Sequence, residues 1–228
     1  MDVHTLPKDG GRGLERDMVV TAALQLLDEV GFSGLTLRRL ADRLKVKAAA
    51  LYWHFENKQD LIDALAERIM MAEFDRIRPK SLDWRDMLAM IGRTHRRALM
   101  RYRDGAEVMA HANLRHNTML EGMELLLQTL QAQGFTPEQA MASVFTVIRF
   151  TIGCVFEEQA DPRSKETSHQ ERVHRIQELS ERYPTFAGSI KAVMADAGKG
   201  PDYLFERGLQ FILDGVAAGL AQPGSEHA

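Results

Sequence analysis

The chain has little cysteine, and it lacks the long apolar segments that membrane proteins need. Its 228 residues include one cysteine, Cys154, which excludes an internal disulfide framework and suits a reducing cytoplasm. No apolar run approaches the roughly 18 residues that span a bilayer. The polar N-terminal stretch lacks the apolar core of a secretion signal. We therefore expect a cytoplasmic protein.

Sequence patterns of catalysis are also missing. The chain has no zinc motif, no glycine-rich phosphate loop and no nucleophile elbow, and Cys154 lies within an apolar helical segment. These absences predict that the protein is not an enzyme and that it uses no cofactor or metal. An all-α enzyme remains a distant alternative.

Helical periodicity extends over almost every segment from residue 16 onward. The pattern predicts helices near residues 19–30, 37–44, 48–55, 57–77, 84–102, 119–133, 137–158, 171–182 and 203–220. No segment alternates as a strand would, so the fold class is all-α. We expect a flexible N-terminal arm over 1–15, a three-helix helix-turn-helix DNA-binding domain over 16–62, and an effector-binding and dimerisation domain over 63–222.

Positive charge is concentrated in the predicted helix-turn-helix. The whole chain carries a net charge of -3, so it is not a polycation. Between residues 37 and 58, six basic and two acidic residues leave a net charge of +4. Such local charge is what contacts to DNA phosphates require, although charge of this kind is also common on a solvated helical face. A short helix after a tight turn is typical of a recognition helix that enters the major groove.

A family resemblance favours DNA binding over the solvated face. The segment 35–66, and above all Leu51-Tyr52-Trp53-His54-Phe55 followed by Asn57-Lys58, resembles the helix-turn-helix of the tetracycline-repressor family of bacterial regulators. The similarity continues through residues 96–106 and 150–157 and covers about residues 16–160, with a weaker match near 205–220. It implies a homodimer, a palindromic double-stranded DNA operator, and release from DNA when a small-molecule effector binds.

The resemblance also implies which residues contact DNA. Together with the basic Lys47, the predicted DNA-binding residues are Arg38, Lys47, Ala48, Ala50, Tyr52, Trp53, His54 and Lys58. The recognition helix reads Ala48-Ala49-Ala50 where tetracycline repressors carry polar groups and a proline. Alanine methyls can contact thymine methyls but donate no hydrogen bond, so the operator must differ and depend more on Arg38, Lys47 and DNA shape. Lys45 replaces the usual turn glycine, which costs about 1 kcal/mol if that position is left-handed.

The expected effector pocket departs from that of the relatives. Tetracycline repressors hold a drug–magnesium complex with a histidine whose position is Met109 here, and only Glu157 remains as a ligand for such a complex. Other polar pocket positions of the relatives correspond to Phe74, Ile91, Ala112, Asn113, Leu114 and Leu125. Thioethers and phenyl rings are poor ligands for magnesium. We therefore predict that the protein does not sense tetracycline–magnesium.

The residues at these positions describe an apolar cavity with sparse polar anchors, as small-molecule sites usually have. The predicted effector-binding residues are Phe74, Met87, Ile91, His95, Met109, Asn113, Met119, Met123, Arg149, Phe150 and Glu157. Any single Met or Phe fits an ordinary core equally well, whereas His95, Arg149 and Glu157 are stronger candidates because buried polar groups need partners. We expect an aromatic, phenolic or polyketide-like effector.

The sequence is also compatible with other effectors and with activation of transcription. His111 and His116 could bind a metal or haem iron, although their spacing of five does not place both on one helix face. His169 and His174 have the same spacing in a polar segment and are expected at the surface. The same head could instead respond to a partner protein, or could activate transcription rather than repress it.

Dimerisation is expected along the helices near 137–158 and 203–220. Small residues there allow close helix approach: Ala140, Ala142, Ser143, Gly208, Gly215, Ala217, Ala218 and Gly219. Dimeric DNA readers need their recognition helices about 34–36 Å apart. We expect the effector to move residues 103–113 against the fourth helix, so that the two heads no longer fit adjacent grooves.

Overall fold

The computed structural model describes residues 15–74, 82–113, 117–160, 178–194 and 201–221. Within these ranges all regular structure is helical, which confirms the all-α fold class. The helices are α1 (Arg16–Gly34), α2 (Leu37–Leu44), α3 (Ala48–Leu51), α4 (Lys58–Phe74), α5 (Trp84–Met100), α6 (Gly105–His111), α7 (Asn117–Ala132), α8 (Pro137–Ala160), α10 (Pro184–Met194) and α11 (Pro201–Ala221). Most of the expected N-terminal arm and of the helix expected at 171–182 lies outside the described residues, as do His116, His169 and His174.

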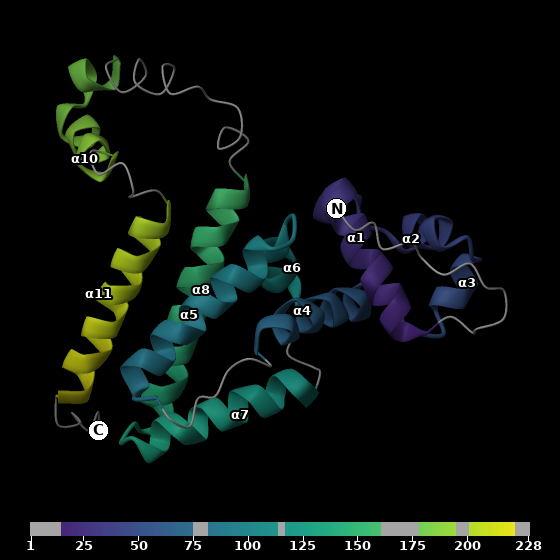
Figure 1. Cartoon of the computed structure of the whole chain (residues 1–228), viewed down its shortest axis with the longest axis horizontal. Coiled ribbons are helices and arrows are strands. Elements are labelled where there is room, and N and C mark those ends of the chain that lie inside the picture. Colours follow the sequence, from purple (N-terminus) through teal and green to yellow (C-terminus); the bar gives the residue numbers. More distant parts are fainter. Residues whose placement is uncertain (1–14, 75–81, 114–116, 161–177, 195–200, 222–228) are drawn as a thin grey trace, which may run out of the picture.

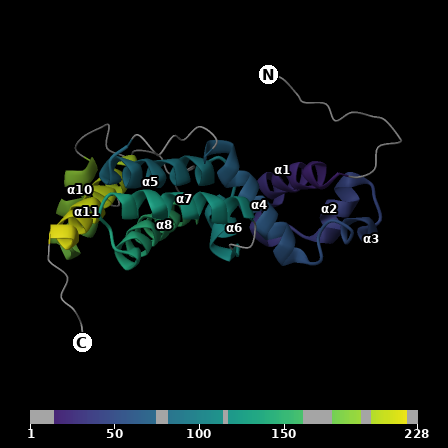
Figure 2. The same cartoon turned by 90° about the horizontal axis from the view of Figure 1, so that it is seen from below.

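The molecule is elongated, with α1, α2 and α3 at one end and α5, α7, α8 and α11 at the other (Figures 1 and 2). Helix α4 runs from the first group to the second and packs on α1, α5 and α6. We call α1–α4 the head and α5–α11 the body. Helix α8 is central to the body, because it contacts α5, α6, α7 and α11.

Local signals in the sequence fix the helix-turn-helix. Thr36 caps α2, since its Oγ1 accepts a hydrogen bond from the backbone N–H of Arg39 at 3.2 Å. Helix α2 ends at Lys45, whose φ of 56° and ψ of 38° are left-handed, and this is the conformation that the sequence analysis considered. Helix α3 begins three residues later, at Ala48. Lys45 therefore adopts a backbone conformation that favours glycine.

The structure corrects three expectations about helices. Helix α3 ends at Leu51 rather than at Phe55, because the N–H groups of His54 and Phe55 both donate to the Leu51 carbonyl and the chain turns there. Helix α6 was not predicted as an element, and it begins after Asp104, whose φ of 55° is also left-handed. Helix α10 was likewise missed after Pro184.

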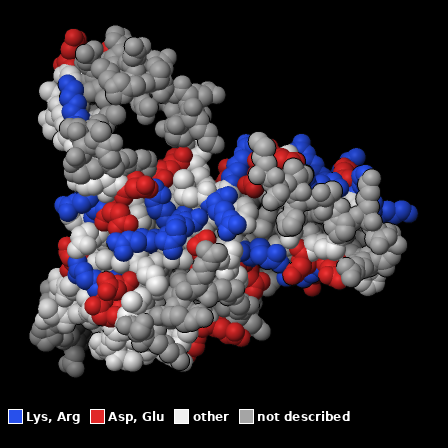
Figure 3. Space-filling view, in the orientation of Figure 1, with Lys and Arg blue, Asp and Glu red and all other residues white. Residues whose placement is uncertain are grey.

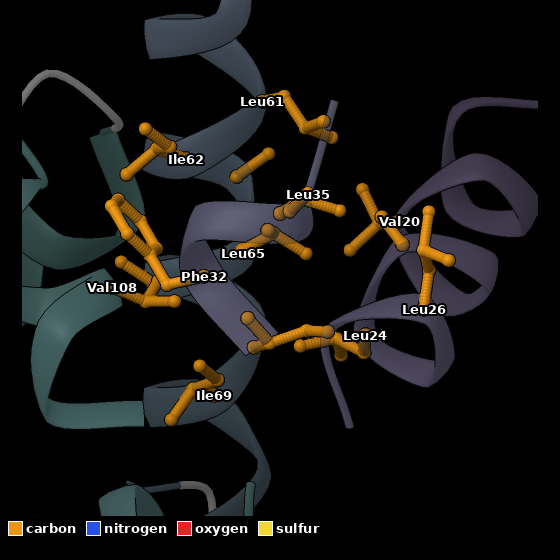
Figure 4. Packing of buried hydrophobic residues seen from close by; sticks show 14 of the residues in the cluster. Val20, Leu24, Leu26, Phe32, Leu35, Leu61, Ile62, Leu65, Ile69 and Val108 are labelled. Carbon is orange, nitrogen blue, oxygen red and sulfur yellow. The ribbon is translucent and has the colours of Figure 1, made fainter. Parts of the chain in front are cut away.

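Two hydrophobic clusters hold the fold together. The first joins α1–α4 and takes in Ala106 and Val108 of α6, and Figure 4 shows Phe32, Ile62 and Val108 converging from α1, α4 and α6. The second joins α5, α8 and α11 around Met87, Val147 and Leu209. Apolar packing is therefore continuous from the head into α6. Helix α6 therefore packs directly on α4 and on the end of α1.

Helix α8 is long and apolar enough to cross a membrane by length and composition, contrary to the expectation that no segment approaches this test. Its most apolar window has a mean hydropathy of 1.5, and 33% of that window is buried. In this fold the helix packs against four others, so its buried part belongs to a protein core. The remaining apolar part is exposed in the single chain.

Candidate DNA interface and ligand cavity

The exposed surface of α3 is made of methyl groups and aromatic rings. Leu51 and Phe55 are fully buried and anchor the helix to the head. Ala48 and Ala49 are exposed and Ala50 is half-buried. The neighbouring turn presents Tyr52 and Trp53, and 89% of the Trp53 surface is accessible; His54 is half-buried beside them. Tyr52 and Trp53 thus place two exposed aromatic side chains directly after α3.

The basic residues of the head fall into two groups. The guanidinium of Arg39 donates to the Gly34 carbonyl at 3.0 Å, and that of Arg43 donates to Glu29 at 2.6 Å, so both side chains attach α2 to α1. Among the described residues, Arg38, Lys45 and Lys47 make no ion pair or hydrogen bond through their side chains, and all three are exposed.

Lys58 is also exposed, with its Nζ 5.0 Å from the centre of the Phe32 ring. Figure 3 shows Lys and Arg at the edge of the head farthest from the body. The cations that remain available to phosphates therefore flank α3 and the start of α4.

The body contains a cavity of about 870 Å³ between α4, α5, α6, α7 and α8. Its wall is dominated by thioether, aliphatic and aromatic side chains. The residues that line it are Met70, Met71, Met87, Met90, Ile91, His95, Met109, Ala110, Ala112, Met119, Gly122, Met123, Leu125, Leu126, Phe145, Ile148, Arg149, Ile152, Gly153, Phe156 and Glu157. The volume is within the range of small-molecule sites, and unbranched methionines adapt to ligands of irregular shape.

Three polar side chains lie in this wall. His95 is buried, and its Nδ1 donates to the Ile91 carbonyl at 3.0 Å. Burial lowers the pKa of His95 to about 4, against the opposing effect of that backbone hydrogen bond, so the imidazole is neutral at pH 7. The guanidinium of Arg149 lies 4.9 Å from the centre of the Phe145 ring. Glu157 lies two helical turns further along α8, so a cation and an anion face the same space.

Most of the predicted effector-binding residues surround this cavity, but not all of them. The structure does not bring Phe150 there, because its ring stacks on Phe205 of α11 at 5.6 Å on another side of α8. Asn113 does not line the cavity either; its backbone N–H donates to the Asp63 carboxylate at 2.8 Å. The side chain of Phe74 is outside the described residues.

Part of the cavity wall was not predicted from the sequence. Met90 and Met71 line the cavity beside predicted residues of the same helices, and Phe145, Ile152 and Phe156 follow one face of α8. Helical spacing carried this signal, because Met87, Met90 and Ile91 are separated by three and four positions. The resemblance alone could not supply it.

Helix α6 connects the cavity to the head at both of its ends. At its start, the Asp104 carboxylate accepts from the Phe32 N–H at 2.8 Å. At its end, the His111 carbonyl accepts from the Gln59 side chain at 2.7 Å, and the His111 ring lies 4.8 Å from that of Phe32. Between these points Met109 reaches the cavity. The seven residues of α6 therefore connect the cavity wall directly to α1 and to the start of α4.

A helix-turn-helix with unpaired cations at one end, and an apolar cavity coupled to it at the other, define a ligand-binding transcriptional regulator. Residues 19–65 match the family described as bacterial regulatory proteins, tetR family, and residues 78–220 match the tetracyclin repressor-like, C-terminal domain. The chain therefore belongs to the TetR family of transcriptional regulators, which are not enzymes.

Similar proteins agree with this assignment. The chain is 40% identical over 206 residues to the tetracycline repressor protein class A from transposon 1721 of Escherichia coli, covering 90% of this chain and 91% of that protein. A TetR variant from Acinetobacter baumannii AYE, solved in complex with minocycline, has a TM-score of 0.70 and 32% identity and covers 92% of this chain and 99% of its own. BioQ solved with its double-stranded DNA operator has a TM-score of 0.62 and 29% identity, covering 90% and 99%.

Proposed function

We propose that this protein is a cytoplasmic repressor that binds a palindromic operator as a homodimer and is released by a largely apolar or aromatic small molecule. Residues 16–62 serve as the DNA-binding domain and residues 63–222 bind the effector and the second copy. The residues proposed to contact DNA are Arg38, Lys47, Ala48, Ala50, Tyr52, Trp53, His54 and Lys58. The residues proposed to contact the effector are the predicted ones that line the cavity, namely Met87, Ile91, His95, Met109, Met119, Met123, Arg149 and Glu157.

Support for a dimer comes from apolar surface that the single chain leaves uncovered. On α8, Met141 and Phe156 are exposed, and on α11, Leu204 and Phe211 are exposed, the last with 64% of its surface accessible. The two helices pack on each other, since Phe150 lies against Gly208 and stacks on Phe205. Burial of these two faces against their copies would remove these exposed apolar side chains from water.

Support for a metal-free effector comes from the donor set of the cavity. Among the described residues, Glu157 is the one carboxylate in the cavity wall, and the methionine sulfurs are soft donors that a magnesium ion does not favour. No group of three or more His, Cys, Asp or Glu that could hold a metal occurs among the described residues, so nothing in that part of the chain favours the metal-sensing alternative. We therefore maintain that the effector is not a tetracycline–magnesium complex.

The observation that carries the proposal is that α6 is hydrogen-bonded to the head at both of its ends. An effector that fills the space beside Met109 and Ala112 presses on a helix whose ends are bonded to α1 and α4. Because Asp63 of α4 is buried and accepts the Asn113 N–H, a shift of the segment after α6 moves α4 as well. The heads of a dimer would then change their separation. To convert a mostly bound into a mostly released protein, the effector must favour the released form by several kcal/mol.

The test measures DNA binding and release with the purified full-length protein. Fluorescence anisotropy with duplexes from the region upstream of its own gene should show salt-sensitive, sequence-specific affinity, and sedimentation should show a dimer. Addition of quercetin, as a planar aromatic probe, should lower the anisotropy, whereas tetracycline with magnesium should not. Release by tetracycline only when magnesium is present would contradict the effector assignment. A monomer without specific affinity would contradict the whole proposal.

A further inference from the structure

The four-residue recognition helix has no side chain that can form a hydrogen bond with a base. Its sequence is Ala-Ala-Ala-Leu, and Leu51 is committed to the core. What α3 itself offers outward is the methyl groups of Ala48 and Ala49, since Ala50 is half-buried. In the major groove, the apolar feature of a base pair is the 5-methyl group of thymine.

The arginines beside α3 differ in their freedom to contact a base. Arg39 and Arg43 are both bonded to α1, through Gly34 and Glu29. Arg38 is exposed on the first turn of α2 and has no side-chain partner among the described residues. A free guanidinium forms a bidentate contact with guanine O6 and N7, which an ammonium cannot reproduce.

From these two observations we infer that each operator half-site is read by Arg38 on one guanine and by the methyl groups of Ala48 and Ala49 on adjacent thymines. This inference rests on the proposed function, because it requires that the protein binds a specific operator. It predicts that few hydrogen bonds to bases form in each half-site. Apart from one G·C pair, thymine methyl groups account for most of the preference for the operator over other sequences. Lys45 and Lys47, exposed on the turn before α3, then contact phosphates and do not select bases.

Replacement of thymine by uracil tests the methyl contact directly, since it removes one methyl group and changes no hydrogen bond. The preferred duplex is first selected from a random library with the full-length protein. It is then resynthesised with uracil at single positions and measured by anisotropy at fixed salt. Each contacted methyl group should contribute about fourfold in affinity. Uracil at thymines outside the half-sites should change nothing.

Protein variants test the same contacts from the other side. Arg38→Lys keeps the charge and should reduce the preference for the guanine over other bases roughly tenfold. Arg39→Lys is the matched control, because Arg39 is bonded to Gly34, and it should leave that preference intact. Ala49→Ser places a hydroxyl where the methyl contact is expected, so the ratio of thymine to uracil affinities should approach one at the position that it contacts. Circular dichroism of each variant establishes that the head is folded.

The outcomes separate this inference from the function on which it rests. If the protein prefers its selected duplex but binds the uracil forms equally well, methyl readout is wrong and operator binding stands. The same holds if Arg38→Lys leaves the guanine preference unchanged. If no duplex is preferred over random DNA, the proposed function itself fails, and the inference with it.

Discussion

The head and the body bury their apolar side chains to different extents. Large head residues such as Phe55, Leu40 and Leu65 are fully buried, and the exposed large hydrophobics of the head are Met18, Tyr52 and Trp53, two of which flank the recognition helix. In the body the exposed large hydrophobics extend over α5, α7, α8, α10 and α11. The head thus buries almost all of its large apolar side chains within one chain. The body leaves apolar surfaces exposed that a second copy and a ligand would cover.

Ion pairs sharpen the contrast within the body. Arg96, with little exposed surface, pairs with Glu158 at 3.0 Å and with Asp202 at 2.5 Å, joining α5, α8 and α11. Arg93 pairs with Glu206 at 2.7 Å, and its guanidinium lowers the pKa of that carboxyl. No comparable ion pair crosses the cavity among the described residues that line it. The α11 side of the body therefore carries ion pairs between helices that the described cavity wall lacks.

The largest predicted effect concerns the uncovered face of α11. Phe211→Glu places a charge at the centre of the expected dimer surface, where an unpaired buried charge is not tolerated. The protein should become monomeric, and operator affinity should fall about 10²–10⁴-fold because two linked heads no longer bind together. Sedimentation velocity and anisotropy measure the two changes.

Leu120→Glu is the matched control for that variant. Leu120 is exposed on α7, so it lies on neither of the two helices of the expected dimer surface, and it does not line the cavity. It should leave both the dimer and the operator affinity unchanged. A dimeric Phe211→Glu protein would show that the body does not depend on this face.

The next effect is the pH dependence that His95 contributes to stability. Because its folded pKa of about 4 lies below the ordinary 6.5, the unfolded chain takes up the proton first as the pH falls. Stability from this group is therefore lost below pH 6.5, by about 2 kcal/mol between pH 7 and pH 5. His95→Gln should remove that part of the decrease in urea denaturation. An equally steep decrease in the variant would mean that His95 is not held neutral in the wall.

A smaller effect tests whether the body has true empty space beside α7. A Cβ atom added at Gly122 meets no atom within 4 Å, and the residue lines the cavity. Gly122→Phe should therefore fold normally, and should weaken binding of the fluorescent probe 1-aminoanthracene at least roughly tenfold by occupying its site. Leu120→Phe, on the same helix outside the cavity, should bind the probe as before. Unchanged binding in both variants would place the probe elsewhere.

The sequence predicted the helices of the body better than the faces that they present. Periodicity identified α8, but residues 149 and 150 are 100° apart on a helix, and only the packing of Phe150 on Phe205 shows which one turns away from the cavity. Helix α6 escaped prediction because it has seven residues and starts after a left-handed Asp104, which no periodicity reveals. The role of Arg39 was similarly hidden, since its bond to Gly34 depends on how α2 crosses α1.

The smallest effect concerns the turn of the head, where compact packing coexists with local strain. Lys45 is left-handed and exposed, so Lys45→Gly should stabilise the protein by about 1 kcal/mol in urea denaturation by relieving that conformation. Lys45→Ala retains the strain and removes the same charge, so both variants should lose equal operator affinity at low salt. Only the glycine variant should gain stability. Equal free energies of unfolding for the two variants would show that the left-handed backbone at Lys45 does not destabilise the head.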